Sequence, residues 1–181
     1  MRTQRALGEA LVELMLAHAW ADISVQQVLD RARVGRATFY AHFRGKDDLL
    51  LSDAERFWGM MEAHFLRVAP GTTRVAPVAE LFAHVADFAR FTDALARAGL
   101  QGTVYDLLAG HIARLIERRL AELRPDAERA SLPRAGMARV FAAALLEMLR
   151  WWTERPDRPS PREMDHRFHE LVWGGVARVA P

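Results

Sequence analysis

The sequence predicts an all-α protein in which a three-helix, helix-turn-helix domain precedes a larger helical body. Apolar residues recur at helical spacing along the chain, and no stretch alternates apolar and polar residues at the period of a strand. Breaks rich in Pro or Gly lie near residues 69–73, 124–134 and 156–161. We therefore expect about nine helices, with a domain of residues 1–47 and a second domain of residues 48–181.

The composition excludes several classes of protein. Hydrophobic residues make up 51% of the 181 residues, which is enough for a core, and the absence of cysteine excludes disulfides, thiol nucleophiles and thiolate-ligated zinc. The longest apolar run, residues 141–146, is too short to span a bilayer. Because Glu9 and Glu13 interrupt the region that a signal peptide keeps apolar, we expect a cytoplasmic protein with no membrane partner.

The N-terminal segment contains four predicted helices. Leu7, Leu11 and Leu14 mark a stripe of the first, and Ser24 with Gln27 three residues later forms a capping box that starts the second. A third, short helix is expected from about residue 35 to 43. A fourth runs from about 45 to 67, with acidic residues in its first turn, where the helix dipole favours them.

The rest of the chain predicts four further helices, near residues 76–97, 102–123, 135–154 and from 161 almost to the C-terminus. The segment 76–97 is apolar on more than one side, which is typical of a central helix. Ser160, Pro161 and Glu163 supply an N-cap, a proline at the first helical position and the return leg of a capping box.

Residues 24–50 fit a helix-turn-helix, in which the second helix enters the major groove of DNA. Phe39 and Phe43 lie on one side of that helix and need a core, while small residues on the opposite side allow a close approach to base edges. Seven cationic side chains against four anionic ones within residues 1–46 indicate an anionic partner. Taken alone, Tyr40 could equally be a packing residue, and Arg36 could be a solvated surface charge. The prediction of DNA binding therefore depends on the order and spacing of the residues in 24–50 as a set.

The same residues resemble the N-terminal pattern of the TetR/AcrR family of transcriptional regulators, over roughly residues 3–50. The matching positions are Ser24, Val25, Val28, Ala32, Val34, Thr38, Phe39, Tyr40, His42, Phe43, Lys46 and Leu49. The resemblance implies phosphate contacts from Ser24, Thr38, Tyr40, His42 and Lys46. It implies base readout at Gln26, Arg36, Ala37 and Ala41, of which the two alanines cannot donate a hydrogen bond to a base.

Two residues depart from the family pattern. Arg33 replaces the glycine of the turn, so that either Arg33 lies in a less comfortable backbone conformation or the turn has shifted its glycine. Gly35 replaces a serine; glycine can cap a helix but offers no side-chain oxygen. These two departures leave open which residue is the first of the recognition helix.

The resemblance also implies that the body binds a small-molecule inducer, whose identity the sequence does not reveal. A cavity lined by aromatic residues with a few polar groups is the usual form of such a site, and the alternative is that these side chains are ordinary core or surface residues. The candidates are Phe65, Phe88, Phe91, Tyr105, Leu108, His111 and Trp151.

The last two helices each carry an apolar face, which either packs within the chain or forms an association surface. The resemblance implies a homodimer joined by a four-helix bundle, and two-fold symmetry would present two recognition helices to a pseudo-palindromic operator in double-stranded DNA. The candidate interface residues are Phe141, Leu145, Met148, Trp152, Phe168, Leu171, Val172 and Gly175.

The prediction is a ligand-responsive, DNA-binding transcriptional regulator, most often a repressor in this family, with no catalytic residues and no cofactor. No nucleophile elbow, phosphate-binding loop or His-Glu-x-x-His motif indicates an enzyme. His166 and His169, beside Asp165, leave a metal-responsive regulator as one alternative. A helical protein-interaction module that has lost DNA binding is the other.

Overall fold

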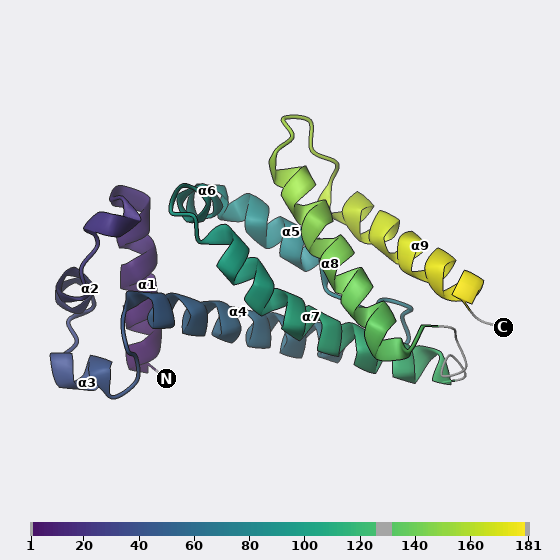
Figure 1. Cartoon of the computed structure of the whole chain (residues 1–181), viewed down its shortest axis with the longest axis horizontal. Helices are drawn as coiled ribbons and strands as arrows, with labels where there is room; N and C mark the ends of the chain where they lie inside the picture. Colours follow the sequence, from purple (N-terminus) through teal and green to yellow (C-terminus); the bar gives the residue numbers. More distant parts are fainter. Residues whose placement is uncertain (1, 126–131, 180–181) are drawn as a thin grey trace. The chain divides into compact units, whose positions relative to one another are not determined.

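The computed structural model describes residues 2–125 and 132–179, with side chains to residue 176. These residues form nine α-helices, one 3₁₀ turn and no strand, so the all-α prediction is confirmed for the described ranges (Figure 1). The contacts divide the chain into two compact units. The first contains residues 1–57 and 88–104, and the second contains residues 58–87 and 105–181.

The first unit holds the N-terminal helices α1 (Arg2–Ala17), α2 (Val25–Ala32) and α3 (Arg36–Tyr40), the 3₁₀ turn η1 (Trp20–Asp22), the first half of α4 (Lys46–Val68) and α6 (Ala89–Arg97). α1 packs against both α2 and α6. Its apolar stripe is buried as predicted, with Leu7 and Leu11 at most 1% exposed. A side chain at Gly8 would collide with Asp53, so this glycine lets α1 and α4 approach closely.

The second unit holds the end of α4 with α5 (Val78–Asp87), most of α7 (Gln101–Leu123), α8 (Arg134–Thr153) and α9 (Pro161–Val179). α5 packs against α9, and the ring of Phe82 on α5 meets that of Trp152 on α8 edge to face at 5.2 Å. α9 begins with the predicted cap, since Ser160 and Glu163 exchange both capping-box hydrogen bonds.

The predicted single helix over 76–97 is wrong, because the chain leaves helical geometry at Phe88. This residue has φ −109° and ψ 31°, and its carbonyl caps the start of α6 by accepting from the N–H groups of Phe91 and Thr92. The break lets α5 bury its stripe in the second unit while Ala94 and Leu95 of α6 are buried in the first. The two apolar stripes of residues 76–97 therefore belong to two short helices, α5 and α6, which pack in different units.

The predicted boundary after residue 47 falls at the start of α4, whereas the contacts divide the chain inside α4, after Phe57, and return residues 88–104 to the first unit. The predicted loop over 124–134 contains residues 126–131, which lie outside the described ranges.

Candidate nucleic-acid interface

The turn between α2 and α3 keeps a tight helix-turn-helix geometry despite its missing glycine. Arg33 adopts the left-handed conformation, with φ 54° and ψ 45°, and is the one described non-glycine residue with positive φ. A side chain in this region costs on the order of 1 kcal/mol. Gly35 is the N-cap of α3 in extended geometry and gives no side-chain hydrogen bond. The first alternative for Arg33 and the expectation for Gly35 are confirmed, and α3 begins at Arg36.

The inner side of α3 anchors it in the first unit. Phe39 is 0% and Phe43 is 5% exposed, and their ring centroids lie 5.5 Å apart. Phe39 also receives the ring of Tyr40 edge to face at 5.2 Å. Since burying two phenylalanines stabilises the unit by several kcal/mol, the orientation of this five-residue helix is set by its aromatic side.

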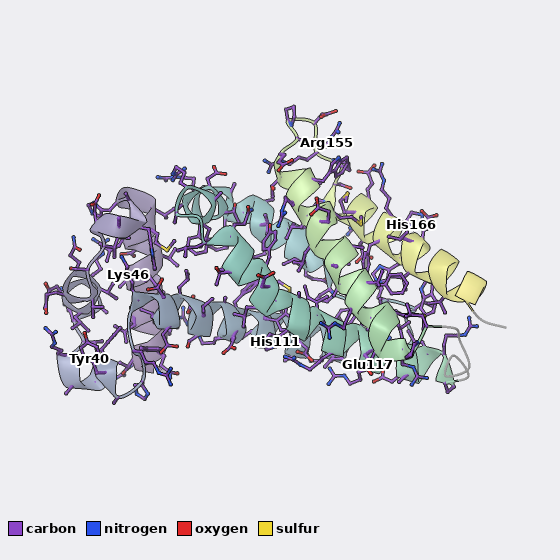
Figure 2. The ribbon with its side chains drawn as sticks, viewed as in Figure 1. Tyr40, Lys46, His111, Glu117, Arg155 and His166 are labelled. Atoms are coloured by element: carbon purple, nitrogen blue, oxygen red, sulfur yellow. The ribbon has the colours of Figure 1, made fainter. Side chains whose placement is uncertain are left out.

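The outer side of α3 exposes every predicted contact residue that it carries: Arg36, Ala37, Thr38, Tyr40, Ala41 and His42 are exposed, the last two in the turn that follows the helix. The guanidinium of Arg36 lies 5.5 Å from the ring centroid of Tyr40. Figure 2 shows the Tyr40 side chain at this end of the first unit. The strip combines donors with small residues, which suits an approach to a DNA groove.

Two predicted contact residues on α2 have their polar groups engaged within the chain. The Ser24 hydroxyl accepts from the N–H of Gln27, and the backbone N–H of Ser24 donates to the Gln27 side-chain oxygen at 2.7 Å, which completes the capping box. The hydroxyl also donates to the same oxygen at 2.9 Å. The Gln26 amide donates to Asp30 at 2.8 Å. Both side chains are exposed, so DNA contact would require them to exchange these local partners.

Lys46 has a structural role that the sequence did not reveal. Its Nζ donates to the carbonyl of Trp20 at 2.5 Å and of Ile23 at 2.7 Å, and lies 4.5 Å from the centroid of the Trp20 ring. The ammonium thus ties the start of α4 to the turn after α1. An ammonium has three donors, so one N–H remains for a phosphate.

Comparison with known proteins agrees with this geometry. Residues 8–52 match the family model of the bacterial regulatory proteins of the tetR family. The activator DhaS of the dhaKLM operon of Lactococcus lactis is 35% identical over 48 residues, which is 26% of each chain. Two solved structures share the fold: a protein of Pseudomonas aeruginosa PAO1 (TM-score 0.71, 21% identity, 97% of this chain and 93% of that chain) and the fatty acid degradation regulator FadR of Bacillus halodurans (0.68, 18%, 96% and 95%).

The first unit therefore carries the helix-turn-helix of a DNA-binding transcriptional regulator. Residues 8–52 form a DNA-binding domain of the tetR family of bacterial regulatory proteins. The match to the curated relative spans about a quarter of that protein's length, so the likeness in sequence concerns this domain.

The candidate ligand residues are distributed over both units. In the second unit Phe65, Tyr105 and Leu108 are buried, His111 is half-buried and Trp151 is 41% exposed beneath the guanidinium of Arg155. In the first unit Phe91 is half-buried and Phe88 is 49% exposed. The ligand site stays a prediction.

Most of the candidate interface residues belong to the core of a single chain. Phe141, Leu145, Trp152, Phe168 and Val172 are between 0% and 8% exposed. A Cβ on Gly175 would lie 3.2 Å from the Phe141 ring, so this glycine lets α8 and α9 pack together. For these six residues the intramolecular alternative holds, because α8 and α9 use their most apolar faces inside the unit. Leu171 is 50% exposed and Met148 half-buried, and both remain candidates.

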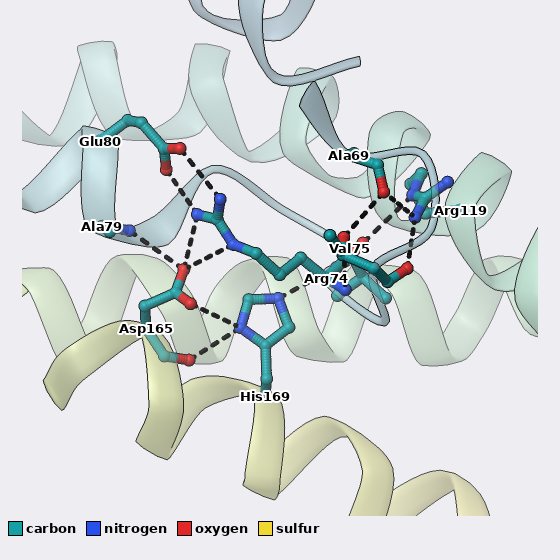
Figure 3. Close-up of polar contacts among 9 residues, drawn as sticks. Ala69, Arg74, Val75, Ala79, Glu80, Arg119, Asp165 and His169 are labelled. Atoms are coloured by element: carbon teal, nitrogen blue, oxygen red, sulfur yellow. Dashed lines mark hydrogen bonds and ion pairs between the residues drawn. The ribbon is translucent and has the colours of Figure 1, made fainter. Parts of the chain in front are cut away.

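The proposed metal pair does not converge. The ring of His169 accepts from the N–H of Val75 at 2.9 Å and donates to the Asp165 carbonyl at 2.7 Å, so both its nitrogens are engaged (Figure 3). His166 is exposed and lies 3.3 Å from Glu170. Within the described ranges, no three His, Asp or Glu side chains could hold a metal ion.

A charged network instead holds the segment before α5 against α9. Arg74 donates to Glu80 and Asp165, while Arg119 donates to the carbonyls of Arg74 and Thr72 (Figure 3). Burial opposes the ionisation of Asp165, but the hydrogen bonds from His169 and Arg74 outweigh it and lower the pKa of this carboxyl. The pKa of Glu80 is lowered in the same way, against its own burial, by Arg74.

Trp58 is a further residue that the sequence analysis missed. This α4 side chain is 0% exposed, and its indole N–H has no hydrogen-bond partner among the described residues. Its position seven residues before the buried Phe65 places both on one face of α4, which is a signal that the sequence did contain.

None of the described helices is long and apolar enough to cross a membrane.

Proposed function

We propose that this chain is a homodimeric transcriptional repressor that binds a pseudo-palindromic operator and is released by a small-molecule ligand. The observation that supports it most is the outer strip of α3, where six consecutive or near-consecutive candidate contact residues are exposed around the buried Phe39. A helix held in the core by its aromatic side and free on its small, donor-rich side suits the major groove.

In this proposal the roles on the strip differ. Arg36 reads a base edge, most readily the two acceptors of guanine, and thereby contributes specificity. Thr38, Tyr40 and His42 donate to phosphates and fix the register without reading sequence. Ala37 and Ala41 permit the close approach and can contact a thymine methyl group.

The experiment is a selection of bound sequences from a random duplex library at moderate salt. An enriched inverted repeat, with half-sites about one helical turn apart, supports a dimeric regulator. No enrichment by folded protein, before and after extraction of bound small molecules, contradicts it and favours the interaction-module alternative. Transcription of a reporter placed behind the enriched site then tests repression: a rise in expression with the protein present would make it an activator, as the related DhaS is named.

The dimer surface is best sought on the outer sides of α8 and α9. Val140 is 58% and Leu171 is 50% exposed, and large apolar side chains on an outer helix face are typical of association surfaces. Met148 adds a half-buried neighbour on α8.

The buried donor of Trp58 supports a ligand in the body. A buried N–H without an acceptor costs about 1–3 kcal/mol, and a ligand oxygen would recover that cost. We propose an apolar ligand that carries a hydrogen-bond acceptor and that favours a body geometry whose two reading heads do not fit successive major grooves.

A matched pair of variants tests this role. Trp58→Phe removes the unpartnered N–H, whereas Trp152→Phe removes an N–H that donates to the carbonyl of Pro159 at 2.7 Å. In a DNA-release assay over a panel of apolar compounds, Trp58→Phe is expected to lose release by the effective compound while keeping DNA affinity. Equal release from Trp58→Phe and the unmodified protein would contradict the proposal.

A further inference from the structure

The first unit contains a pocket of about 290 Å³ where the end of α1 meets the end of α6. Residues 15–20 form one wall, and Ala94, Arg97 and Ala98 form the other. All of these residues belong to the first unit, so the pocket is separate from the ligand site proposed for the body. Its volume is near the lower end of small-molecule sites, which is enough for one or two fused rings.

The chemistry of the lining has an apolar part and a cationic part. Met15 and Ala94 are buried and form an apolar floor, and the half-buried indole of Trp20 offers a flat wall on which a ring can stack. His18 and Arg97 are exposed and border the same pocket. Such a lining suits a planar molecule with one polar end.

Arg97 supplies the charge for that end. No ion pair or hydrogen bond joins its guanidinium to the described residues, in contrast to Arg74 and Arg119, which are fully engaged. A guanidinium fork matches a carboxylate in two parallel hydrogen bonds. One permanent unpaired cation balances a monoanion better than a dianion.

Lys46 strengthens the preference for an anion. Its ammonium lies against the Trp20 ring, 4.5 Å from the centroid, while its own hydrogen bonds go to neutral carbonyl oxygens. No ion pair joins this ammonium to a carboxylate of the described residues, so its charge adds a positive field beside the Trp20 ring.

We propose that this pocket binds a planar aromatic monocarboxylate, with the ring stacked on Trp20 between the two helix ends and the carboxylate paired with Arg97. Such a ligand bridges α1 and α6 and stabilises the first unit, since binding to the folded state alone raises its stability by mass action. The proposal is independent of the DNA-binding function, because the site and its test involve no DNA.

Calorimetric titration of the full chain with 2-naphthoate tests it, with 2-naphthamide as the uncharged counterpart. We expect saturable one-to-one binding of 2-naphthoate and at least about tenfold weaker binding of the amide, because a charge-assisted pair is lost. Equal binding of the two compounds would overturn the monocarboxylate assignment, and no binding of 2-naphthoate would overturn the site.

A variant pair on α6 locates the binding. Arg97→Gln is expected to weaken 2-naphthoate binding by about tenfold. Arg90→Gln removes the same charge from an exposed position of the same helix that does not line the pocket, and it is expected to bind as the unmodified protein does. Equal affinities for both variants would overturn the role of Arg97.

The indole signals of the protein labelled with ¹⁵N at tryptophan give a second readout. The Trp20 resonance, assigned by its loss in Trp20→Phe, is expected to shift on addition of 2-naphthoate, while that of Trp58 in the other unit stays in place. A shift at Trp58 and none at Trp20 would place the ligand in the body and overturn the proposal.

Discussion

Replacement of Lys46 by methionine separates the structural role of this lysine from a role in phosphate contact. The change keeps the length of the apolar stem but removes the hydrogen bonds to the carbonyls of Trp20 and Ile23 and the ammonium–ring contact. Because the side chain is half-buried, we take about 1 kcal/mol for each bond and about 0.5–1 kcal/mol for the ring contact. The free energy of unfolding should fall by about 2–3 kcal/mol.

Thermal unfolding followed by circular dichroism checks this value. For a unit of this size, 1 kcal/mol corresponds to about 4–8 °C, so the midpoint should fall by about 10 °C or more. Arg44→Met is the control, because it removes one neighbouring exposed cation that has no side-chain hydrogen bond among the described residues. The control should keep the midpoint and alter only salt-dependent DNA binding.

The opposite pattern would refute this reasoning. If Lys46→Met kept the unfolding midpoint of the unmodified protein and only reduced the salt slope of DNA binding by about one, Nζ would act purely as a phosphate ligand. The carbonyl contacts would then contribute nothing to stability.

Three further predictions follow from the reading strip, the charged network and the outer face of α9. Arg36→Gln should relax specificity at one base position by about 1–3 kcal/mol in a binding-site selection, whereas Tyr40→Phe should weaken binding to all duplexes several-fold; the reverse would exchange their roles. The lowered pKa of Asp165 stabilises the fold at pH values above the ordinary pKa of an aspartate, and that stabilisation is lost as the pH falls through the lower pKa of the folded state. Asp165→Asn should therefore cost about 2 kcal/mol at neutral pH and flatten the acid limb of a denaturation series; an unchanged limb would contradict this. Leu171→Glu should convert a dimer to a monomer in sedimentation without lowering the melting temperature of the protomer, and a persisting dimer would place the interface elsewhere.

Much of the N-terminal domain could be predicted because its signals are local. The Ser24–Gln27 capping box and the left-handed Arg33 depend on neighbours within a few residues. The burial of Phe39 and the exposure of the residues around it follow from helical periodicity alone. The same periodicity placed the candidate DNA contacts on the outer side of α3.

Other features depended on partners far along the chain. Periodicity on 76–97 shows two apolar stripes, but it does not say that each would be buried in a different unit and that the helix would break at Phe88. An apolar face on α8 or α9 looks the same whether it meets the chain's own α5 or a second copy, and Trp152 met Phe82. That ambiguity is why the interface candidates were largely core residues.

The sequence by itself determined the helical class, the capped starts of α2 and α9 and the identity of the DNA-binding domain, because capping and periodicity are set by residues within one or two helical turns. Only the tertiary structure decided that Lys46 donates to two carbonyls, that Trp58 buries an N–H with no acceptor among the described residues, and that α1 and α6 border a pocket lined in part by Arg97. The Lys46 contacts and the pocket join residues that lie more than twenty positions apart in the sequence. The state of the Trp58 N–H depends on whether the side chains packed around it offer an acceptor. Both kinds of feature are set by packing in three dimensions.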